Sequence, residues 1–143
     1  MIRMVEPEDI TELDEIEKAS FTVPWTTDML LSLCFPPNIG LIEEENGEIL
    51  GYIGMDSVAD EGQILTLATK EGARRRGVAS HLLSEGERRL RSLGVKNVFL
   101  EVRVSNTAAR KLYEKSGFTV VGKRKNYYVL PKEDALICRK ELQ

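Results

Sequence analysis

Two side chains in the second half of the chain have the types and settings that acid–base chemistry needs. Glu101 lies in the run Val98 to Arg103, whose apolar residues alternate, so a strand would turn its carboxylate away from them. Tyr113 lies at helical spacing from apolar neighbours. A carboxylate can take a proton from an ammonium ion, and a phenol can give one to a leaving group. Pattern alone also allows a surface glutamate paired with Arg103 and a core tyrosine with a satisfied hydroxyl.

A basic, glycine-containing turn is the second chemical feature. The run Arg74-Arg75-Arg76-Gly77 follows a strand-like segment, Gln63 to Thr69, and precedes a helix predicted over Val78 to Ser92. Helix N-termini bind phosphate through unpaired N–H groups and the positive dipole end, and Gly77 and Ala79 permit close approach. The Gly-Lys-Ser/Thr ending of a nucleotide P-loop and the three glycines of a dinucleotide turn are missing, which excludes both classes. The alternative is a solvated turn before an ordinary helix.

These residues must be positioned by alternating strands and helices. Asn46-Gly47 between two strand-like runs is the signal for a tight hairpin, and Gly94 ends the long helix as a C-cap. That helix is amphipathic, with Glu87 predicted among its polar residues and a buried face of Val78, Leu82, Leu83, Gly86, Leu90 and Leu93. The predicted elements are a strand at 1–5, a helix that opens at 6–9, a short helix at 28–33, strands at 39–44, 49–55 and 63–69, a helix at 78–92, a strand at 98–103, a helix at 107–116, and strands at 118–123 and 135–139.

Length and composition narrow the class of protein. The 143 residues suit one domain, 1–143, which can bury about 68% of its unfolded surface and needs no disulfide or metal. Cys34 and Cys138 stand alone and are predicted to be small buried side chains in a reducing compartment. Without a bilayer-spanning apolar run or a signal-peptide core, we expect a cytoplasmic protein that does not bind membranes. A net charge of −3 argues against general nucleic-acid binding.

Several motifs together resemble the GNAT acetyltransferases over nearly the whole chain. The pattern Arg74-x-x-Gly77-x-Ala79 is similar to the signature that holds the coenzyme A pyrophosphate in that family. Residues 100–106 match Leu-Glu-Val-Arg-x-Ser-Asn, a motif of the branch that acetylates the N-terminal alanine of a small-subunit ribosomal protein. Further matches to that branch are Ala109–Phe118, Asn126-Tyr127-Tyr128, Glu133-Asp134-Ala135 and, with an insertion, Phe21–Trp25.

The resemblance implies the GNAT fold, an α/β (α+β) architecture. It has a central mixed, mostly antiparallel sheet of roughly six to seven strands flanked by about four helices. In the family two strands splay apart and hold acetyl-coenzyme A between them, and here they are 63–69 and 98–103. The coenzyme-binding residues that the resemblance implies are Leu67, Ala68, Thr69, Arg74, Arg75, Arg76, Gly77, Val78, Ala79 and Asn106.

The resemblance also implies the chemistry: acetyl-coenzyme A as co-substrate, without a metal, and the N-terminal amine of a ribosomal protein as acceptor. Glu101 would be the general base, acting directly or through a water, and Tyr113 the general acid that protonates the departing thiolate. An N-terminal amine has a pKa of about 8, so a nearby carboxylate helps at neutral pH. Lys70-Glu71 and Ala79 depart from the commonest residues of the family but remove no needed side chain.

Several alternatives remain open at this point. The same fold and donor could serve a small amine or a lysine side chain, or the chain could be a non-catalytic acetyl-coenzyme A sensor. The aromatic residues Trp25 and Tyr127-Tyr128 either line the acceptor groove, as the resemblance implies, or pack in a core or hairpin. His81 is interpreted as an ordinary surface residue, and the run Lys123-Arg124-Lys125 as a solvated turn.

Overall fold

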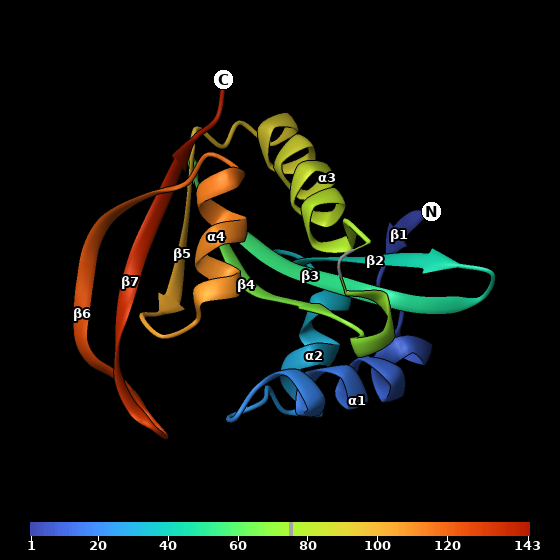
Figure 1. Cartoon of the computed structure of the whole chain (residues 1–143). Helices are drawn as coiled ribbons and strands as arrows, with labels where there is room; N and C mark the ends of the chain where they lie inside the picture. Colours follow the sequence, from blue (N-terminus) through green and yellow to red (C-terminus); the bar gives the residue numbers. More distant parts are fainter. Residues whose placement is uncertain (75) are drawn as a thin grey trace.

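Strands and helices alternate along the chain in the predicted order (Figure 1). The computed structural model describes residues 1–74 and 76–143. Its elements are β1 (Ile2–Met4), α1 (Ile10–Ser20), α2 (Thr27–Leu31), β2 (Ile39–Glu45), β3 (Glu48–Val58), β4 (Glu61–Thr69), α3 (Val78–Ser92), β5 (Asn97–Arg103), α4 (Thr107–Lys115), β6 (Thr119–Val129) and β7 (Lys132–Glu141). Short 3₁₀ turns at Pro7–Asp9, Ser32–Cys34 and Glu71–Ala73 complete the order.

The strands form one mixed sheet in the order β1-β2-β3-β4-β5-β7-β6. The pair β4–β5 is parallel, and the other neighbouring pairs are antiparallel. The β2–β3 hairpin turns at Asn46 and Gly47, whose φ angles of 53° and 78° are the positive values that a tight two-residue turn requires. The predicted fold class is confirmed.

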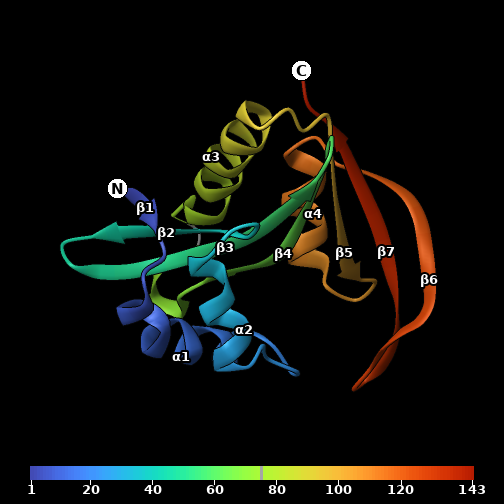
Figure 2. The ribbon, with the colours of Figure 1, turned by 180° about the vertical axis from the view of Figure 1, so that it is seen from behind.

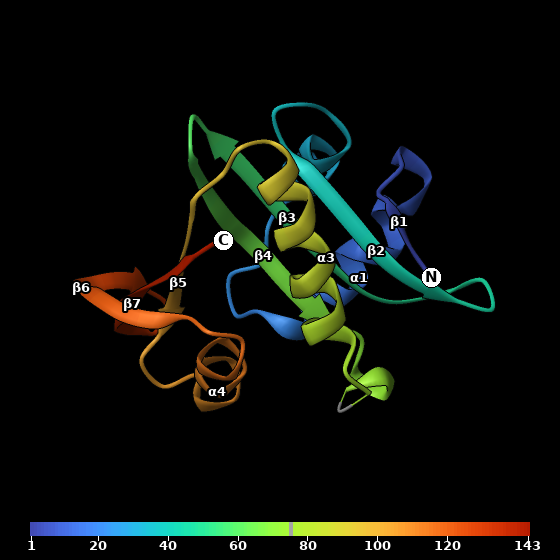
Figure 3. The ribbon, with the colours of Figure 1, turned by 90° about the horizontal axis from the view of Figure 1, so that it is seen from above.

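Helices cover both faces of the sheet (Figure 3). Helices α3 and α4 pack on one face, where Leu82, Leu83 and Leu90 join the larger apolar cluster. Helices α1 and α2 pack on the other face, where Leu13 and Leu30 join the smaller cluster. Among the described residues, no helix has both the length and the apolar character needed to cross a membrane. A core on each face holds the central strands in place.

Strands β4 and β5 pair only briefly before they separate (Figure 2). Their parallel register joins Glu61–Gln63 to Asn97–Phe99. Beyond that point β4 stays bonded to β3 as far as Thr69, and β5 stays bonded to β7 as far as Arg103. Each strand therefore follows a different neighbour, and the two backbone edges diverge. This is the splayed pair that the family resemblance predicts.

Helix α3 has the predicted bounds, but the predicted burial of two residues, Leu93 and Glu87, is wrong. Leu93 is 59% exposed, because the helix ends before it and Gly94, with φ at 87°, turns the chain away. Glu87 is buried, and its carboxylate lies 2.6 Å from the Lys140 ammonium of β7. A charge can be buried when a partner neutralises it, and this partner comes from a distant strand. Periodicity within the helix cannot reveal such a partner.

The last two strands extend further than predicted and meet at Leu130-Pro131. The run 123–125 therefore lies inside β6 and not in a solvated turn, and Glu133-Asp134-Ala135 lies inside β7 rather than before it. Strand β6 is at the edge of the sheet and nearly all of its residues are exposed. Edge strands tolerate charged residues, so a polar run does not mark the end of a strand here.

The two cysteines differ in burial. Cys138 of β7 is buried in the larger cluster, as predicted, whereas Cys34 after α2 is only half-buried. Burial raises the pKa of both thiols, and both are free. The prediction of two fully buried side chains is therefore correct for Cys138 and wrong for Cys34.

Candidate active site

A cavity of about 240 Å³ opens where β4 and β5 separate. Its lining comes from both strands, from α1 and the loop after it, and from α4 and β6. Glu101 of β5 and Tyr113 of α4 both line it. A second cavity, of about 480 Å³, shares Glu101 with the first and adds Arg124 and Tyr127 of β6. The fold thus brings both predicted proton-transfer side chains to one cavity.

The β3–β4 ladder decides which main-chain groups of β4 face the gap. The N–H of Lys70 donates to the Leu50 carbonyl at 2.8 Å, which makes these residues a hydrogen-bonded pair. Because such pairs alternate along an antiparallel ladder, Ala68 also bonds to β3, while Leu67 and Thr69 direct their N–H and C=O groups away from β3. Leu67 and Thr69 can therefore bind a ligand in the gap. The main chain of Ala68 is already paired in the sheet and cannot form the predicted hydrogen bonds.

Glu101 projects from β5 between two buried neighbours, as strand alternation predicts. Its Oε1 lies 3.3 Å from Nε of Arg124. A hydrogen bond with the same carboxylate raises the pKa of Tyr127. Both partners belong to β6, so the pairing with Arg103 that the pattern allowed is not formed. Glu101 lies at the meeting point of the two cavities, beside a cation and a phenol.

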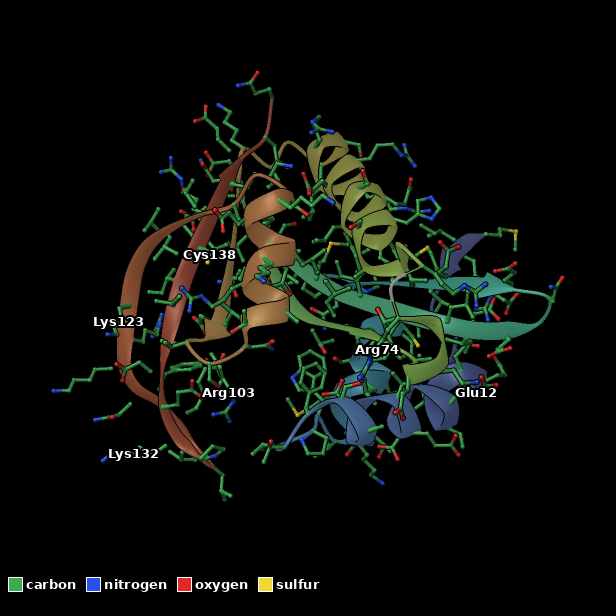
Figure 4. The ribbon with its side chains drawn as sticks, in the orientation of Figure 1. Glu12, Arg74, Arg103, Lys123, Lys132 and Cys138 are labelled. Atoms are coloured by element: carbon green, nitrogen blue, oxygen red, sulfur yellow. The ribbon has the colours of Figure 1, made fainter. Side chains whose placement is uncertain are left out.

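Arg103 instead holds the β6–β7 hairpin. Its guanidinium donates to the carbonyls of Leu130 and Pro131, each at 2.9 Å, and pairs with Glu133 at 3.3 Å. It also lies 4.1 Å from the ring centroid of Tyr128, which lines both cavities. Figure 4 labels Arg103 at the end of β5 nearest this hairpin. One side chain thus connects the end of β5 to the turn of the hairpin and to the cavity wall.

Tyr113 packs its ring into the larger core while lining the cavity. The ring meets Phe118 edge to face with centroids 5.7 Å apart. Burial raises the pKa of the Tyr113 hydroxyl above its ordinary value. The hydroxyl therefore keeps its proton at neutral pH, which is the state that a general acid needs. The packing role and the acid role are compatible in this geometry.

Asn106 caps the helix that carries Tyr113. Its side-chain oxygen accepts a hydrogen bond from the Ala109 N–H at 3.1 Å, the ordinary contact of an N-cap. Asn106 also lines the cavity. Its amide NH₂ group is not used by the cap, so the residue can cap α4 and still donate to a ligand.

The basic turn leads directly into α3. Gly77 is the N-cap residue with φ at 75°, a left-handed conformation that glycine adopts without steric cost. Arg76 pairs with Glu45 at 2.9 Å, and Arg74 lies beside the turn in Figure 4. Val78 is buried and Ala79 half-buried at the start of the helix. Arg75, which is also predicted to bind the coenzyme, lies outside the described residues.

His81 has a carboxylate partner that its sequence neighbourhood does not reveal. Its Nδ1 contacts Oε1 of Glu43 from β2. The His81 side chain is nevertheless 62% exposed and lines neither cavity. The interpretation as a surface residue therefore agrees with its position.

A family model described as the Acetyltransferase (GNAT) family matches residues 10–118. The chain belongs to the GNAT acetyltransferase family. The diverging strands and the turn into α3 are the features that the motifs of this GNAT chain predict.

Individual relatives agree with the GNAT assignment. The ribosomal protein bS18-alanine N-acetyltransferase of Haemophilus ducreyi is 34% identical over 140 residues, with 96% of this chain and 97% of that protein covered. The protein of the same name from Haemophilus influenzae is 35% identical over 140 residues, with coverages of 96% and 95%. The crystal structure of the ribosomal-protein-S18-alanine N-acetyltransferase from Escherichia coli is 29% identical with a TM-score of 0.92, and covers 100% of this chain and 94% of that one. This GNAT chain is an N-acetyltransferase.

Glu17 of α1 is the cavity residue that sequence analysis missed. Its carboxylate is buried, although it lines the cavity. It lies four residues after the buried Leu13 and next to the buried Ile16, on the apolar face of the helix. A carboxylate on the apolar face of a helix is unusual, and this position could have marked Glu17 as a functional residue. Among the described residues, no cluster of three or more His, Cys, Asp or Glu side chains is placed to hold a metal ion.

Proposed function

We propose that this GNAT enzyme transfers the acetyl group of acetyl-coenzyme A to the N-terminal α-amine of a protein, the alanine at the start of ribosomal protein bS18. The observation that carries the proposal is the cavity between β4 and β5, which Glu101 and Tyr113 line together. The acceptor follows from the names of the relatives. A ribosomal acceptor places the reaction in the cytoplasm.

Binding of the donor is supported by the two edges of the gap. The free main-chain groups of Leu67 and Thr69 suit the amides of the pantetheine arm. The turn at Arg74–Gly77 and the start of α3 supply cationic groups and N–H donors for the pyrophosphate. Asn106 is available at the other edge, where α4 begins. The donor would therefore lie across the gap with its thioester near the cavity.

The reaction then needs three proton transfers. Glu101 takes a proton from the ammonium group of the acceptor, which frees the nitrogen lone pair to attack the thioester carbonyl carbon. The C–S bond breaks as the new C–N bond is completed, and Tyr113 gives its proton to the departing sulfur. The nitrogen carries a positive charge after the attack and loses its second proton, which restores the Tyr113 hydroxyl through solvent. The products are the acetylated N-terminus and coenzyme A, and the proton on Glu101 passes to water. Main-chain N–H groups of β4 polarise the carbonyl oxygen.

The acceptor would enter between two walls that already exist. Trp25 belongs to the loop after α1, and Tyr127 and Tyr128 belong to β6. All three aromatic side chains line the second cavity beside Glu101. Burial is the main cause that raises the pKa of Tyr128, to about 12, and its hydroxyl is therefore a hydrogen-bond donor at neutral pH. Such donors suit the main-chain carbonyls of a peptide.

The direct test measures thiol release from acetyl-coenzyme A with peptides of the bS18 N-terminus. Turnover is expected with the free alanine peptide and not with the same peptide blocked at its N-terminus. A peptide with a blocked N-terminus and an internal lysine, and a panel of small amines, test the other acceptor classes. Donor binding without any thiol release would contradict the proposal and favour a sensor.

Replacing Arg74 by Ala tests the proposed pyrophosphate contact. The dissociation constant of acetyl-coenzyme A is expected to rise by about 10-fold, and its dependence on salt to weaken, because one charge-assisted contact to phosphate is lost. Isothermal titration at two salt concentrations measures both effects. Arg91→Ala at the other end of α3 is the matched control, since Arg91 is also exposed. Equal affinities of the two variants would refute the assignment of Arg74.

A further inference from the structure

Glu17 connects three parts of the molecule through one buried carboxylate. The residue lies in α1 and is 2% exposed. Its Oε2 accepts a hydrogen bond from the main-chain N–H of Trp25 at 2.9 Å. Its Oε1 accepts from the hydroxyl of Thr66 at 3.2 Å and from the hydroxyl of Tyr52. The loop after α1 is thereby joined to the central strands β3 and β4.

The carboxylate is held by hydrogen bonds alone. Within the described part of the chain, no lysine, arginine or histidine nitrogen lies within 4.0 Å of Glu17. A buried carboxylate without a counter-ion is unfavourable unless donors satisfy it, and an apolar residue would fill this helix position more cheaply. The three donors offset the burial and fix the orientation of the carboxylate. Glu17 therefore suits a positioning role.

The loop that Glu17 holds has few main-chain hydrogen bonds, although Phe21 and Trp25 pack against the smaller apolar cluster. From residue 22 to residue 26 of the described chain, the N–H of Trp25 is the one main-chain donor with a hydrogen-bond partner. The loop nevertheless supplies Phe21, Val23 and Trp25 to the cavity lining. Val23 between them is 60% exposed, so apolar packing holds only the two ends of this wall. Between those ends, the Glu17–Trp25 contact joins the main chain of the wall to the body of the molecule.

We propose that Glu17 is a positioning residue that fixes the 21–26 loop as the acceptor-side wall of the active site and so sets the affinity for the acceptor peptide. The proposal rests on the proposed function for its kinetic consequence, because the peptide must enter beside Trp25. Its structural consequence, an anchored loop, is independent of any acceptor. The proposed contacts of acetyl-coenzyme A lie in β4 and in the turn before α3, and the 21–26 loop belongs to neither.

Replacing Glu17 by Leu tests the proposal. Leu fills a similar volume but accepts no hydrogen bond, so the Trp25 N–H loses its partner. Gln would be a weaker test, because its amide oxygen can keep the Trp25 contact while its NH₂ group donates to the two hydroxyls. The KM for the free alanine peptide is expected to rise by about 10-fold, while kcat and the KM for acetyl-coenzyme A change by less than about 2-fold. Trp25 is the only tryptophan in the chain, so its emission should shift to longer wavelength.

Tyr52→Phe is the matched control. It removes one donor to Glu17 from the strand side and leaves the Trp25 contact in place. Its peptide KM and tryptophan emission should stay close to wild type after both variants have been shown to fold by circular dichroism. A Glu17→Leu protein with wild-type peptide KM and unshifted emission would overturn the proposal, as would a Tyr52→Phe protein with the same KM rise.

A measurement on the unmodified protein covers the case in which Glu17→Leu does not fold. The Trp25 amide is expected to exchange its hydrogen more slowly than the Val23 amide, because only the former has a partner among the described residues. Equal exchange rates would overturn the anchored loop. Failure of the wild-type enzyme to acetylate any peptide would remove the proposed function, whereas the emission and exchange results would still decide the role of Glu17.

Discussion

Replacing Glu101 by Gln is expected to lower kcat for peptide acetylation by about 10²-fold or more at neutral pH. Gln keeps the shape and can still meet Arg124, but it cannot take a proton from the acceptor ammonium. As the pH rises through the amine pKa of about 8, the acceptor ammonium loses its proton to the solvent and no longer needs a base on the enzyme. The deficit of the variant should therefore shrink with pH. Thiol release measured across this pH range tests both expectations.

Arg124→Gln separates the proton-transfer role of Glu101 from its ion pair. Arg124 lies 3.3 Å from the Glu101 carboxylate, and either substitution removes this ion pair. If the ion pair were the only role of Glu101, the two variants should lose the same activity. If Glu101 is the base, Arg124→Gln should change kcat by only a few-fold, roughly the effect of one exposed ion pair. Equal losses in the two variants, or a loss in Glu101→Gln that does not change with pH, would contradict the assignment.

Local chemistry explains what could be predicted from the sequence. The hairpin at Asn46-Gly47, the start of α3 after Gly77 and the cap at Asn106 each depend on a few adjacent residues. Strand alternation likewise placed Glu101 away from the core. Signals of this kind act before the chain folds upon itself, and they located the strands and the helix that carry the proposed acid and base.

Contacts between distant segments could not be predicted in the same way. Glu87 is buried because Lys140 from the last strand meets it, and Glu101 pairs with Arg124 instead of the neighbouring Arg103. The Glu17 cluster joins residues that are 35 and 49 positions apart. Nothing local marks these partners, since the pairing depends on which strands become neighbours. Sequence reasoning was therefore accurate for elements and incomplete for the network that positions them.

The proposed active site draws its parts from elements that are held independently. Glu101 is carried by β5, which β7 pairs along its whole length, and Tyr113 is carried by α4. The two proposed acceptor walls are held by different side chains, the loop after α1 by Glu17 and the β6–β7 hairpin by Arg103. Changes to a wall should therefore affect peptide binding, whereas changes to Glu101 or Tyr113 should affect the chemical step.

Tyr113→Phe is expected to lower kcat by about 10²-fold because the departing thiolate loses its proton donor. The ring would keep its edge-to-face contact with Phe118, and no hydrogen bond of the hydroxyl is present among the described residues. The free energy of unfolding should therefore change by less than about 1 kcal/mol. Steady-state kinetics and urea unfolding of the same preparation measure the two quantities. Phe118→Leu, which alters the packing and keeps the phenol, should show the reverse pattern.

The leaving group offers a sharper test of the acid. Nitrothiophenyl acetate releases a weakly basic thiolate that departs without a proton, so a missing general acid matters little for it. Wild type and Tyr113→Phe should differ by less than about 3-fold on this donor, while the full deficit persists with acetyl-coenzyme A. A deficit of the same size on both donors would mean that Tyr113 shapes the cavity and does not transfer a proton. Rescue by the better leaving group would assign the proton to the Tyr113 hydroxyl, since packing is the same in both assays.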